Sequence, residues 1–325
     1  MTLTPGINNT KAYNKAQKLD AEIIANPLYD KILHATHTRF SAHRPKLIGL
    51  LANKDVGSYK YAELTQKNCA KNGIIFSIQI ISELLIESYI KWANHSPDID
   101  GIIIYYPIFG ELQHSDGGLM DDYLKDLINH KKDVEGLSHY YRFNLYHDIK
   151  SNVYYTPLHN IAPCTALAII KCLEYLGQYN NVHLPHNKLA NKIVTVINRS
   201  NIVGKPISIL LSNDGADVYS VDKNSIFLMR REAIGKIYDT EKTAEEACSV
   251  SDIIILGVPD ANYKLDTRYI KENTIVINVS SYKNINETEL MKINGIKYIS
   301  SIGKITIAML QYNLLSLCDS FRKPR

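Results

Sequence analysis

One stretch is the most informative about the fold: Val194-Thr-Val-Ile-Asn-Arg-Ser-Asn-Ile-Val-Gly204-Lys-Pro206. It opens with a β-branched apolar run, continues through a polar turn, and ends where Pro206 can open a helix near its first turn. A strand that leads through a turn into a helix brings free backbone N–H groups and the positive end of the helix dipole together. We therefore expect an anion site that suits a dinucleotide pyrophosphate. The usual G-x-G-x-x-G pattern is absent, and Gly204 is the only glycine of the turn.

Short apolar runs recur on both sides of this stretch, and the segments between them are long enough to form helices. The runs occupy residues 47–51, 74–78, 101–105, 193–197, 217–221, 252–256 and 274–278. Runs of this length that alternate with helical patterns are typical of parallel strands buried on both faces. The sequence therefore predicts the α/β class with two domains. We expect an N-terminal α/β domain, a Rossmann-like doubly wound domain, and an active site in the cleft between them.

A change of pattern marks the boundary between the two domains. Residues 140–162 are rich in Tyr, Asn and His without a sustained period, which is typical of a connecting segment. A bridging helix is predicted over 163–177 with Thr165 as its N-cap, and a last amphipathic helix over 306–321. We assign residues 1–162 plus 304–325 to the N-terminal domain and residues 163–303 to the nucleotide-binding domain.

The composition argues against several classes of protein. Of 325 residues, 45% are hydrophobic and 22% are charged, which indicates a chain with a large buried core. With 37 Lys and Arg against 33 Asp and Glu, the net charge of +4 is too small to indicate nucleic-acid binding. Five scattered cysteines without a C-x-x-C pair indicate a reducing compartment. No apolar run suits a membrane helix and no targeting pattern opens the sequence, so we expect a cytoplasmic protein without nucleic-acid or membrane partners.

Asp222 and Arg199 make opposite predictions about the cofactor. Asp222 directly follows the run 217–221, where a carboxylate can bind the adenosine ribose hydroxyls and would repel a 2′-phosphate. The alternative is that Asp222 only caps a turn with Lys223 and Asn224. Arg199 could instead pair with a 2′-phosphate, but the Asp222 carboxylate would oppose that phosphate at close range. We therefore predict NAD rather than NADP.

Two more strand ends in the same domain carry small or apolar residues, in Leu256-Gly-Val-Pro259 and Asn278-Val-Ser-Ser281. Ligands of open α/β sheets lie at the carboxyl ends of strands, where small residues let a nicotinamide or ribose approach the backbone. The predicted cofactor-binding residues are Arg199, Ser200, Val203, Gly204, Pro206, Asp222, Gly257, Val258, Pro259 and Val279.

Several uncommon motifs follow one another along most of the chain. They are Tyr61 with the helical residues up to Lys67, Lys132-Asp-Val-Glu-Gly136, Pro163-Cys-Thr165, Asn198-Arg-Ser-Asn-Ile-Val-Gly-Lys-Pro206 and Thr306-Ile-Ala-Met-Leu310. Together they resemble the methylenetetrahydrofolate dehydrogenase/cyclohydrolase family, and most of all its fungal monofunctional, NAD-dependent branch. The resemblance implies hydride transfer from 5,10-methylenetetrahydrofolate to NAD, giving 5,10-methenyltetrahydrofolate. It also implies a folate-binding N-terminal domain, a homodimer, and a role in the one-carbon metabolism of purine biosynthesis.

The resemblance also assigns residues to the folate site. Asp133, Glu135 and Pro163 correspond to substrate-binding positions, and Tyr61, Thr65 and Tyr105 to catalytic positions. Bifunctional family members hydrolyse the methenyl product with a Tyr and a Lys one helical turn apart, whereas here Tyr61 is followed by Thr65. The family's Gln before the Pro of the third strand is Tyr105.

Hydride transfer tolerates these losses because the protein chiefly aligns the donor with the acceptor. Hydrolysis needs a group that activates water, and Thr is a poor acid or base near neutral pH. Lys67 cannot simply substitute for the missing lysine, because it lies about 200° around the helix from Thr65 and is expected at the surface. We therefore predict dehydrogenase activity with little or no cyclohydrolase activity.

Smaller departures affect the folate and nicotinamide contacts. Glu135 replaces the family's Asp and moves the carboxylate by one methylene, which should preserve pterin recognition. Ala166 replaces a proline in the first turn of a helix, at little cost. The glycine- and proline-rich turn before the last helix is reduced to Ser301-Ile-Gly-Lys304, which leaves that nicotinamide contact open.

Other interpretations of these residues remain open from the sequence. The chain could be a bifunctional enzyme that recruits Lys60 or Lys67 through a distorted helix, or a non-catalytic dinucleotide-binding protein. Tyr61 could be a packed helical tyrosine, and Cys164 either a reactive or a buried structural thiol. Lys131 and Lys132 could attract a folate polyglutamate tail or form a solvated basic face. His34 and His37 lack a third ligand, so we predict no metal.

Overall fold

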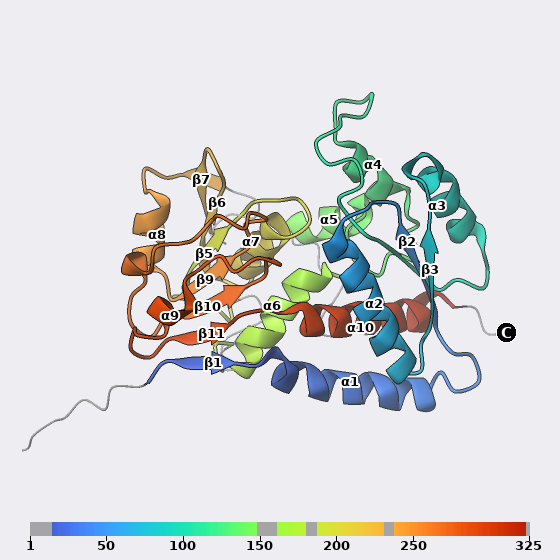
Figure 1. Ribbon diagram of the computed structural model, residues 1–325, viewed down its shortest axis with the longest axis horizontal. Helices are drawn as coiled ribbons and strands as arrows, with labels where there is room; N and C mark the ends of the chain where they lie inside the picture. The colour runs from blue at the N-terminus through green and yellow to red at the C-terminus, as the bar shows by residue number, and fades with distance from the viewer. Residues whose placement is uncertain (1–14, 148–160, 180–186, 231–236, 323–325) are drawn as a thin grey trace, which may run out of the picture.

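The structure is a computed structural model that describes residues 15–147, 161–179, 187–230 and 237–322. It contains two β-sheets at opposite ends of an elongated molecule, with α6 (Cys164–Tyr175) and α10 (Gly303–Phe321) running between them (Figure 1). Helices lie against both sheets. The chain therefore folds as two α/β units, in agreement with the predicted fold class.

The smaller sheet lies in the N-terminal half and has three parallel strands in the order β3-β2-β4. Its strands are β2 (Lys46–Leu51), β3 (Ile75–Ile80) and β4 (Gly101–Ile104), close to the predicted runs. Helix α2 (Val56–Lys71) connects β2 to β3 and has Asp55 as its N-cap, whose carboxylate accepts the Ser58 N–H at 2.7 Å. The other helices of this half are α1 (Ala21–His37), η1 (Glu83–Leu85), α3 (Ile86–His95), α4 (Met120–Leu127) and α5 (His139–Tyr146).

The larger sheet has eight strands in the order β1-β11-β10-β9-β5-β6-β7-β8. Its centre consists of the predicted strands β5 (Ile193–Ile197), β6 (Asp217–Val221), β9 (Ile253–Leu256) and β10 (Ile275–Asn278), all parallel. The helices of this half are α7 (Gly204–Asn213), α8 (Ala244–Val250), η2 (Thr267–Tyr269) and α9 (Glu287–Leu290). Strands β5, β6, β9 and β10 end at the same edge, which brings the predicted cofactor residues together.

Four strands of this sheet were not predicted. They are β1 (Gln17–Leu19), β7 (Ile226–Met229), β8 (Ile237–Asp239) and β11 (Lys297–Ile299). Each has only three or four residues, and β1 and β8 are mostly exposed, so they lack the long apolar runs of buried strands. β6, β7 and β8 pair antiparallel, whereas β1 comes from the N-terminal region and pairs parallel with β11.

Helices α6 and α10 form the connection between the two sheets. α10 is buried along most of its length and packs against α1 and α6. The prediction of Thr165 as the N-cap of α6 is wrong, because Pro163 occupies that position. Pro163 has non-helical backbone angles, with φ −53° and ψ 126°, and its carbonyl accepts the first helical N–H, from Leu167, at 2.9 Å. Thr165 consequently lies inside the first turn.

Of the predicted connecting segment 140–162, residues 148–160 lie outside the described residues, and the segment before them includes most of α5. The division of the chain at residues 162, 163, 303 and 304 stays a prediction. Within the described ranges, no helix combines the length and the apolar character needed to cross a membrane.

Candidate active site

The three predicted catalytic residues come together beside the small sheet. Tyr61 and Thr65 lie one turn apart on α2, and Tyr105 follows the end of β4. The rings of Tyr61 and Tyr105 meet edge to face, with centroids 6.0 Å apart and planes at 76°. Burial raises the pKa of Tyr61 well above its usual value, and the neighbouring Cys164 and Glu135 act in the same direction. The phenol therefore stays neutral over the physiological pH range.

Thr65 is fully buried, and its hydroxyl forms a hydrogen bond within its own helix. Its hydroxyl donates to the Tyr61 carbonyl at 2.8 Å, one turn back along α2. Lys60 and Lys67 are both exposed, as predicted for Lys67, and α2 is an uninterrupted helix. The distorted helix that would bring either lysine to the position of Thr65 is therefore not present.

Tyr105 fills the space beside Thr65. Its side chain is 4% exposed, and its hydroxyl has no hydrogen-bond partner within the described part of the chain. Burial raises the pKa of this phenol, an effect that the adjacent Thr65 hydroxyl partly opposes. The strand end is fixed by the Asn53 side-chain amide, which donates to the carbonyls of Tyr105 and Pro107, each at 2.8 Å. Sequence reasoning missed Asn53, because it lies outside every quoted motif.

The two acidic residues of Lys132-Asp-Val-Glu-Gly136 have different environments. The Asp133 carboxylate is buried and accepts the backbone N–H groups of Glu135, Gly136 and Ser138 at 3.1, 2.9 and 2.8 Å. Asp133 therefore shapes the loop, and its predicted contact with substrate stays a prediction. Gly136 has a φ of +66°, and a Cβ there would lie 2.8 Å from the Ala162 carbonyl carbon, so only glycine fits this crossing.

The Glu135 carboxyl group keeps hydrogen-bond acceptor positions for a ligand. The carboxylate accepts the Ile104 N–H in a long hydrogen bond of 3.4 Å. Burial raises the pKa of Glu135 to about 8, and the nearby Asp133 carboxylate adds to that shift. A pterin ring that donates hydrogen bonds would stabilise the ionised form of this group. The geometry therefore fits the predicted substrate role of Glu135 better than that of Asp133.

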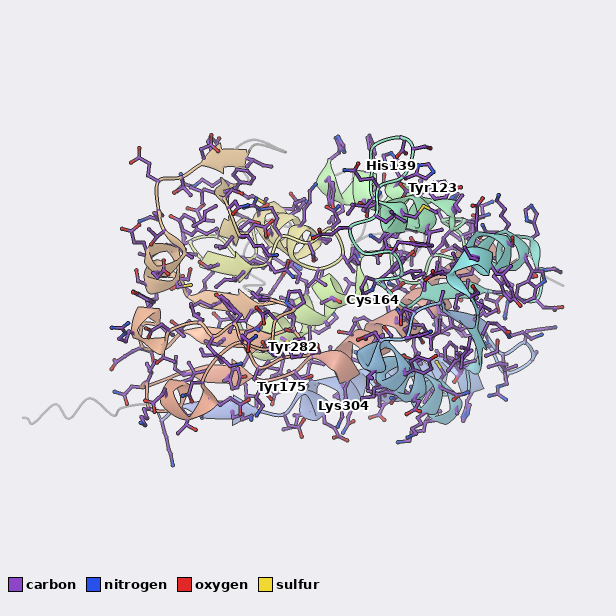
Figure 2. All side chains as sticks on the ribbon, turned by 45° about the horizontal axis from the view of Figure 1, so that its top comes forward. Tyr123, His139, Cys164, Tyr175, Tyr282 and Lys304 are labelled. Atoms are coloured by element: carbon purple, nitrogen blue, oxygen red, sulfur yellow. The ribbon has the colours of Figure 1, made fainter. Side chains whose placement is uncertain are left out.

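Cys164 lies at the start of α6, between the two α/β units (Figure 2). Its thiol donates to the Val134 carbonyl at 3.2 Å and receives the Asn313 side-chain amide at 3.4 Å. Burial raises the pKa of the thiol well above its usual value. Of the two interpretations of Cys164, the structure supports the buried structural thiol. Pro163, predicted to bind substrate, stands beside it as the N-cap of α6.

The lysines next to this loop do not form a free basic face. The Lys132 ammonium donates to the carbonyls of Ala93 and Ser96 at 2.8 and 2.7 Å, at the C-terminal end of α3. This contact stabilises the negative end of a helix dipole. Lys131 lies over the Phe321 ring, with its ammonium 5.6 Å from the centroid. Lys132 is therefore engaged by the protein rather than available to a polyglutamate tail.

The cofactor turn between β5 and α7 is built from side chains where other proteins use glycines. Asn198 has a φ of +109°, donates to the Gly257 carbonyl at 2.6 Å and accepts the Ser200 N–H at 2.9 Å. The Ser200 hydroxyl accepts the Val203 N–H at 3.2 Å. A Cβ on Gly204 would lie 1.5 Å from the Asn198 carbonyl oxygen, so the helix can start here only with glycine.

Pro206 is the third residue of α7, as the sequence predicts for a proline near the first turn. The turn also contacts the other unit, because the Asn201 side chain donates to the Asp122 carboxylate on α4 at 3.0 Å. Asp122 in turn pairs with Lys125 at 2.6 Å. Sequence reasoning missed this contact, since nothing in the motifs around Asp122 indicates it.

Asp222 and Arg199 occupy different positions relative to solvent. The Asp222 side chain is exposed at the end of β6 and accepts the Lys223 N–H at 2.9 Å, so the turn contact that formed part of the alternative interpretation is present. Its carboxylate can still receive a ribose hydroxyl, because a carboxylate has several acceptor positions. The Arg199 guanidinium is partly buried and bonded to Ser220 and Ser225.

The remaining cofactor residues lie at the ends of β9 and β10. A Cβ on Gly257 would lie 3.0 Å from the Val279 side chain, which shows how closely these two predicted residues approach. The Val258 N–H donates to the Asn284 side chain at 2.9 Å, and the Ser280 hydroxyl donates to the Val258 carbonyl at 2.8 Å. Pro259 follows directly. The structure therefore places the predicted residues of the two strand ends side by side.

The turn before α10 borders a separate hollow of about 390 Å³, lined by Lys18, Leu19, Asp20, Ala21, Ser300, Ser301 and Lys304. Lys304, labelled in Figure 2, pairs with Glu22 of α1, and its carbonyl accepts the Tyr29 hydroxyl at 2.7 Å. The turn is thus tied to α1. In the described ranges, no group of three or more His, Cys, Asp or Glu side chains is arranged to hold a metal ion.

Two family models match the chain in succession. The model described as tetrahydrofolate dehydrogenase/cyclohydrolase, catalytic domain, matches residues 12–135. The model described as tetrahydrofolate dehydrogenase/cyclohydrolase, NAD(P)-binding domain, matches residues 163–321. The two matches contain, respectively, the small sheet with Tyr61, and the cofactor turn with α10.

Individual proteins match over most of the chain. A methylenetetrahydrofolate dehydrogenase (NAD+) from Schizosaccharomyces pombe is 40% identical over 286 residues, covering 86% of this chain and 87% of that protein. One from Dictyostelium discoideum is 39% identical over 311 residues, covering 94% and 96%. The solved structure of the NAD-dependent 5,10-methylenetetrahydrofolate dehydrogenase from Saccharomyces cerevisiae superimposes with a TM-score of 0.84. It is 37% identical and covers 94% of this chain and 97% of that chain.

Proposed function

The chain belongs to the tetrahydrofolate dehydrogenase/cyclohydrolase family, and we propose that it oxidises 5,10-methylenetetrahydrofolate to 5,10-methenyltetrahydrofolate with NAD. We further propose that it has little or no cyclohydrolase activity. The observation that carries this second part is the pair Thr65 and Tyr105, which fills the positions of the hydrolytic Lys and Gln with buried, neutral groups.

The cofactor site is formed by residues that fit an NAD molecule. The turn from Asn198 to Gly204 lets a pyrophosphate approach the backbone at the start of α7, because Gly204 presents no side chain there. The exposed Asp222 carboxylate accepts the ribose hydroxyls and disfavours a 2′-phosphate. NAD, when bound, supplies the hydride acceptor. The protein's part is to hold the nicotinamide beside Gly257 and Val279, next to the folate.

On the folate side, Glu135 binds the pterin ring through its carboxylate and thereby orients the methylene bridge. Tyr61 and Tyr105 form an aromatic wall against that ring and exclude water from it. Alignment of this kind supplies a large part of the rate of a hydride transfer, and no protein group needs to gain or lose a proton.

Hydrolysis of the methenyl product requires a base or proton carrier for water. Tyr61 and Tyr105 stay protonated because burial raises the pKa of both phenols. The Thr65 hydroxyl is bonded to the Tyr61 carbonyl. None of the three groups activates water near neutral pH. The methenyl compound should therefore leave the enzyme intact.

The experiment that tests the proposal follows reduced cofactor and methenyl product separately, with NAD or with NADP. We expect both to accumulate with NAD, and the methenyl product to persist no less than in buffer without enzyme. Turnover only with NADP would contradict the role of Asp222. Enzyme-dependent loss of the methenyl product would indicate a bifunctional enzyme, and NAD binding without turnover would indicate a non-catalytic protein.

We also propose a cytoplasmic homodimer that acts in one-carbon metabolism and supplies purine biosynthesis, on folates with or without a polyglutamate tail. The five cysteines are all free and buried, which suits a reducing compartment. Strand β8 leaves Ile237 and Tyr238 exposed at an edge of the large sheet, and such an edge is open to pairing with a second copy. Light scattering of wild type and Ile237→Lys tests the dimer, and cell fractionation tests the location.

A further inference from the structure

Arg199 makes an unusually complete set of contacts with the hairpin formed by β6 and β7. Its Nε donates to the Ser220 hydroxyl at 3.1 Å, and one terminal nitrogen donates to the Ser225 hydroxyl at 2.8 Å. The other terminal nitrogen donates to the carbonyls of Ser220 and Ser225, the latter at 2.9 Å. All three guanidinium nitrogens are thus bound to the hairpin.

The Phe227 ring holds the guanidinium from one face. The guanidinium carbon lies 4.0 Å from the ring centroid, which is a close cation–π contact. Because the ring and the four hydrogen bonds come from the same hairpin, the side chain can leave only if all of these contacts are lost together. Arginine is suited to this role, since its planar fork can bind several acceptors in one rigid geometry.

The same contacts reach Asp222 through a shared acceptor. The Ser225 carbonyl receives both the Asp222 N–H and the Arg199 guanidinium, each at 2.9 Å. Asp222 lies in the short turn between Val221 and Ile226, the last cross-strand pair of the hairpin. The position of the Asp222 carboxylate at the ribose site therefore depends on a turn that Arg199 fastens to the end of β5.

We propose that Arg199 is a positioning residue for cofactor choice: it clamps the turn that presents Asp222 to the adenosine ribose, and it is thereby withheld from any 2′-phosphate. The proposal rests on the proposed function and deepens it. It resolves the opposition between the two residues, because Arg199 assists the NAD-selecting carboxylate instead of competing with it. Selectivity against NADP then has two causes. The Asp222 carboxylate repels a 2′-phosphate, and Arg199 is bound to the hairpin and does not reach that phosphate.

Binding titrations with NAD and with adenosine 2′,5′-bisphosphate test the clamp without depending on turnover. We expect Arg199→Met and Asp222→Asn each to weaken NAD binding about tenfold, since each removes the same ribose contact. The double variant should be no more than about threefold weaker than either single variant, because residues that act as a unit are not additive. Losses that multiply to about a hundredfold would overturn the proposal.

The 2′-phosphate probe separates a clamped arginine from a free one. In the Asp222→Asn background, adding Arg199→Met should change the affinity for adenosine 2′,5′-bisphosphate less than about threefold. A loss of about tenfold or more would show that Arg199 binds the phosphate and would overturn the clamp.

Two further variants distinguish loss of the Arg199 contacts from a general loss of folding. Arg199→Lys keeps the charge but not the fork, so it should weaken NAD binding as Arg199→Met does; full rescue by lysine would contradict the clamp. Arg230→Met removes the ion pair with Asp217 at the far end of the same hairpin and should leave NAD affinity unchanged. For Arg199→Met, kcat at saturating NAD and the folate KM should stay at the wild-type values.

These outcomes distinguish the clamp from the function on which it rests. Failure of the wild type to bind NAD would overturn the proposed function, and the role of the clamp with it. Normal NAD binding by both the wild type and Arg199→Met would overturn the clamp alone.

Discussion

The folate pocket and the cofactor turn both depart from the usual motifs of their kind, but with opposite consequences. In the proposed folate pocket, Thr65 and Tyr105 stand at the positions of the family's hydrolytic Lys and Gln, and both side chains are buried and neutral. In the cofactor turn, Asn198 and Ser200 stand where glycines are usual, and their side chains rebuild the turn through hydrogen bonds. On the proposed function, the departure from the motif removes a chemical step in the first region, whereas it leaves the geometry of the turn intact in the second.

Gly204→Ala should have the largest effect, because it replaces the one glycine that the cofactor turn requires. The new Cβ would lie 1.5 Å from the Asn198 carbonyl oxygen, so either the turn or the start of α7 must move. We expect a loss of about 2–4 kcal/mol in the free energy of unfolding and of about a hundredfold in NAD affinity. Urea unfolding and an NAD titration measure these changes.

Gly303→Ala is the matched control, because it also lies at the start of a helix but has its nearest neighbour at 3.9 Å. It should leave the free energy of unfolding near the wild-type value. If both alanine variants lost the same free energy of unfolding, the steric account of Gly204 would be wrong.

Glu135→Gln should have the next largest effect and a characteristic pH dependence. Since the pKa of Glu135 is raised to about 8, the free enzyme carries this group protonated at neutral pH, whereas the bound pterin prefers the carboxylate. Wild-type folate affinity should therefore fall as the pH is lowered through 8, and Glu135→Gln should lose about tenfold in folate affinity and most of this pH dependence. Profiles of kcat/KM for folate against pH measure both effects.

The stability of Glu135→Gln should change in the opposite direction. A carboxyl group whose pKa is raised by folding stabilises the folded state at low pH, and this contribution is lost as the pH rises from about 4.5 to about 8. Glutamine has no such titration. The variant should therefore gain stability relative to the wild type as the pH rises through that window, in urea unfolding at pH 5 and pH 9. A constant difference between the two proteins would contradict the raised pKa.

The sequence could predict those features of the two regions that depend on contacts within one short stretch of the chain. The strands of both sheet centres and the turn into α7 follow from runs and spacings in one short stretch. The Arg199 clamp could not be predicted, because it depends on the hairpin that β7 forms with β6, and β7 is a strand of four residues without a buried apolar run. Likewise, it is the Asp133 carboxylate, and not that of Glu135, that accepts the N–H groups of Gly136 and Ser138. No spacing rule predicts which of the two carboxylates does so.

Thr65→Lys combined with Tyr105→Gln tests whether a hydrolytic step can be introduced. Thr65→Lys alone should destabilise the fold by about 1–3 kcal/mol, because the ammonium enters a fully buried position beside the Tyr105 ring. We expect measurable methenyl hydrolysis only in the double variant, where Gln leaves room and offers a partner. Lys67→Ala, at an exposed position of the same helix, should change neither activity. Hydrolysis by Thr65→Lys alone would show that Tyr105 is not part of the obstacle.

Asn198→Gly should have the smallest effect, because two consequences of the change oppose each other. The side chain loses its bonds to the Gly257 carbonyl and the Ser200 N–H, which costs about 1–2 kcal/mol. At the same time, glycine adopts the φ of +109° without the strain that Asn bears, which returns about 1 kcal/mol. Asn198→Ala loses the bonds and keeps the strain, so it should be clearly less stable than Asn198→Gly in urea unfolding. If the two variants were equally stable, the backbone of residue 198 would carry no strain. The hydrogen bonds of the Asn198 side chain alone would then explain how this turn forms without glycine at residue 198.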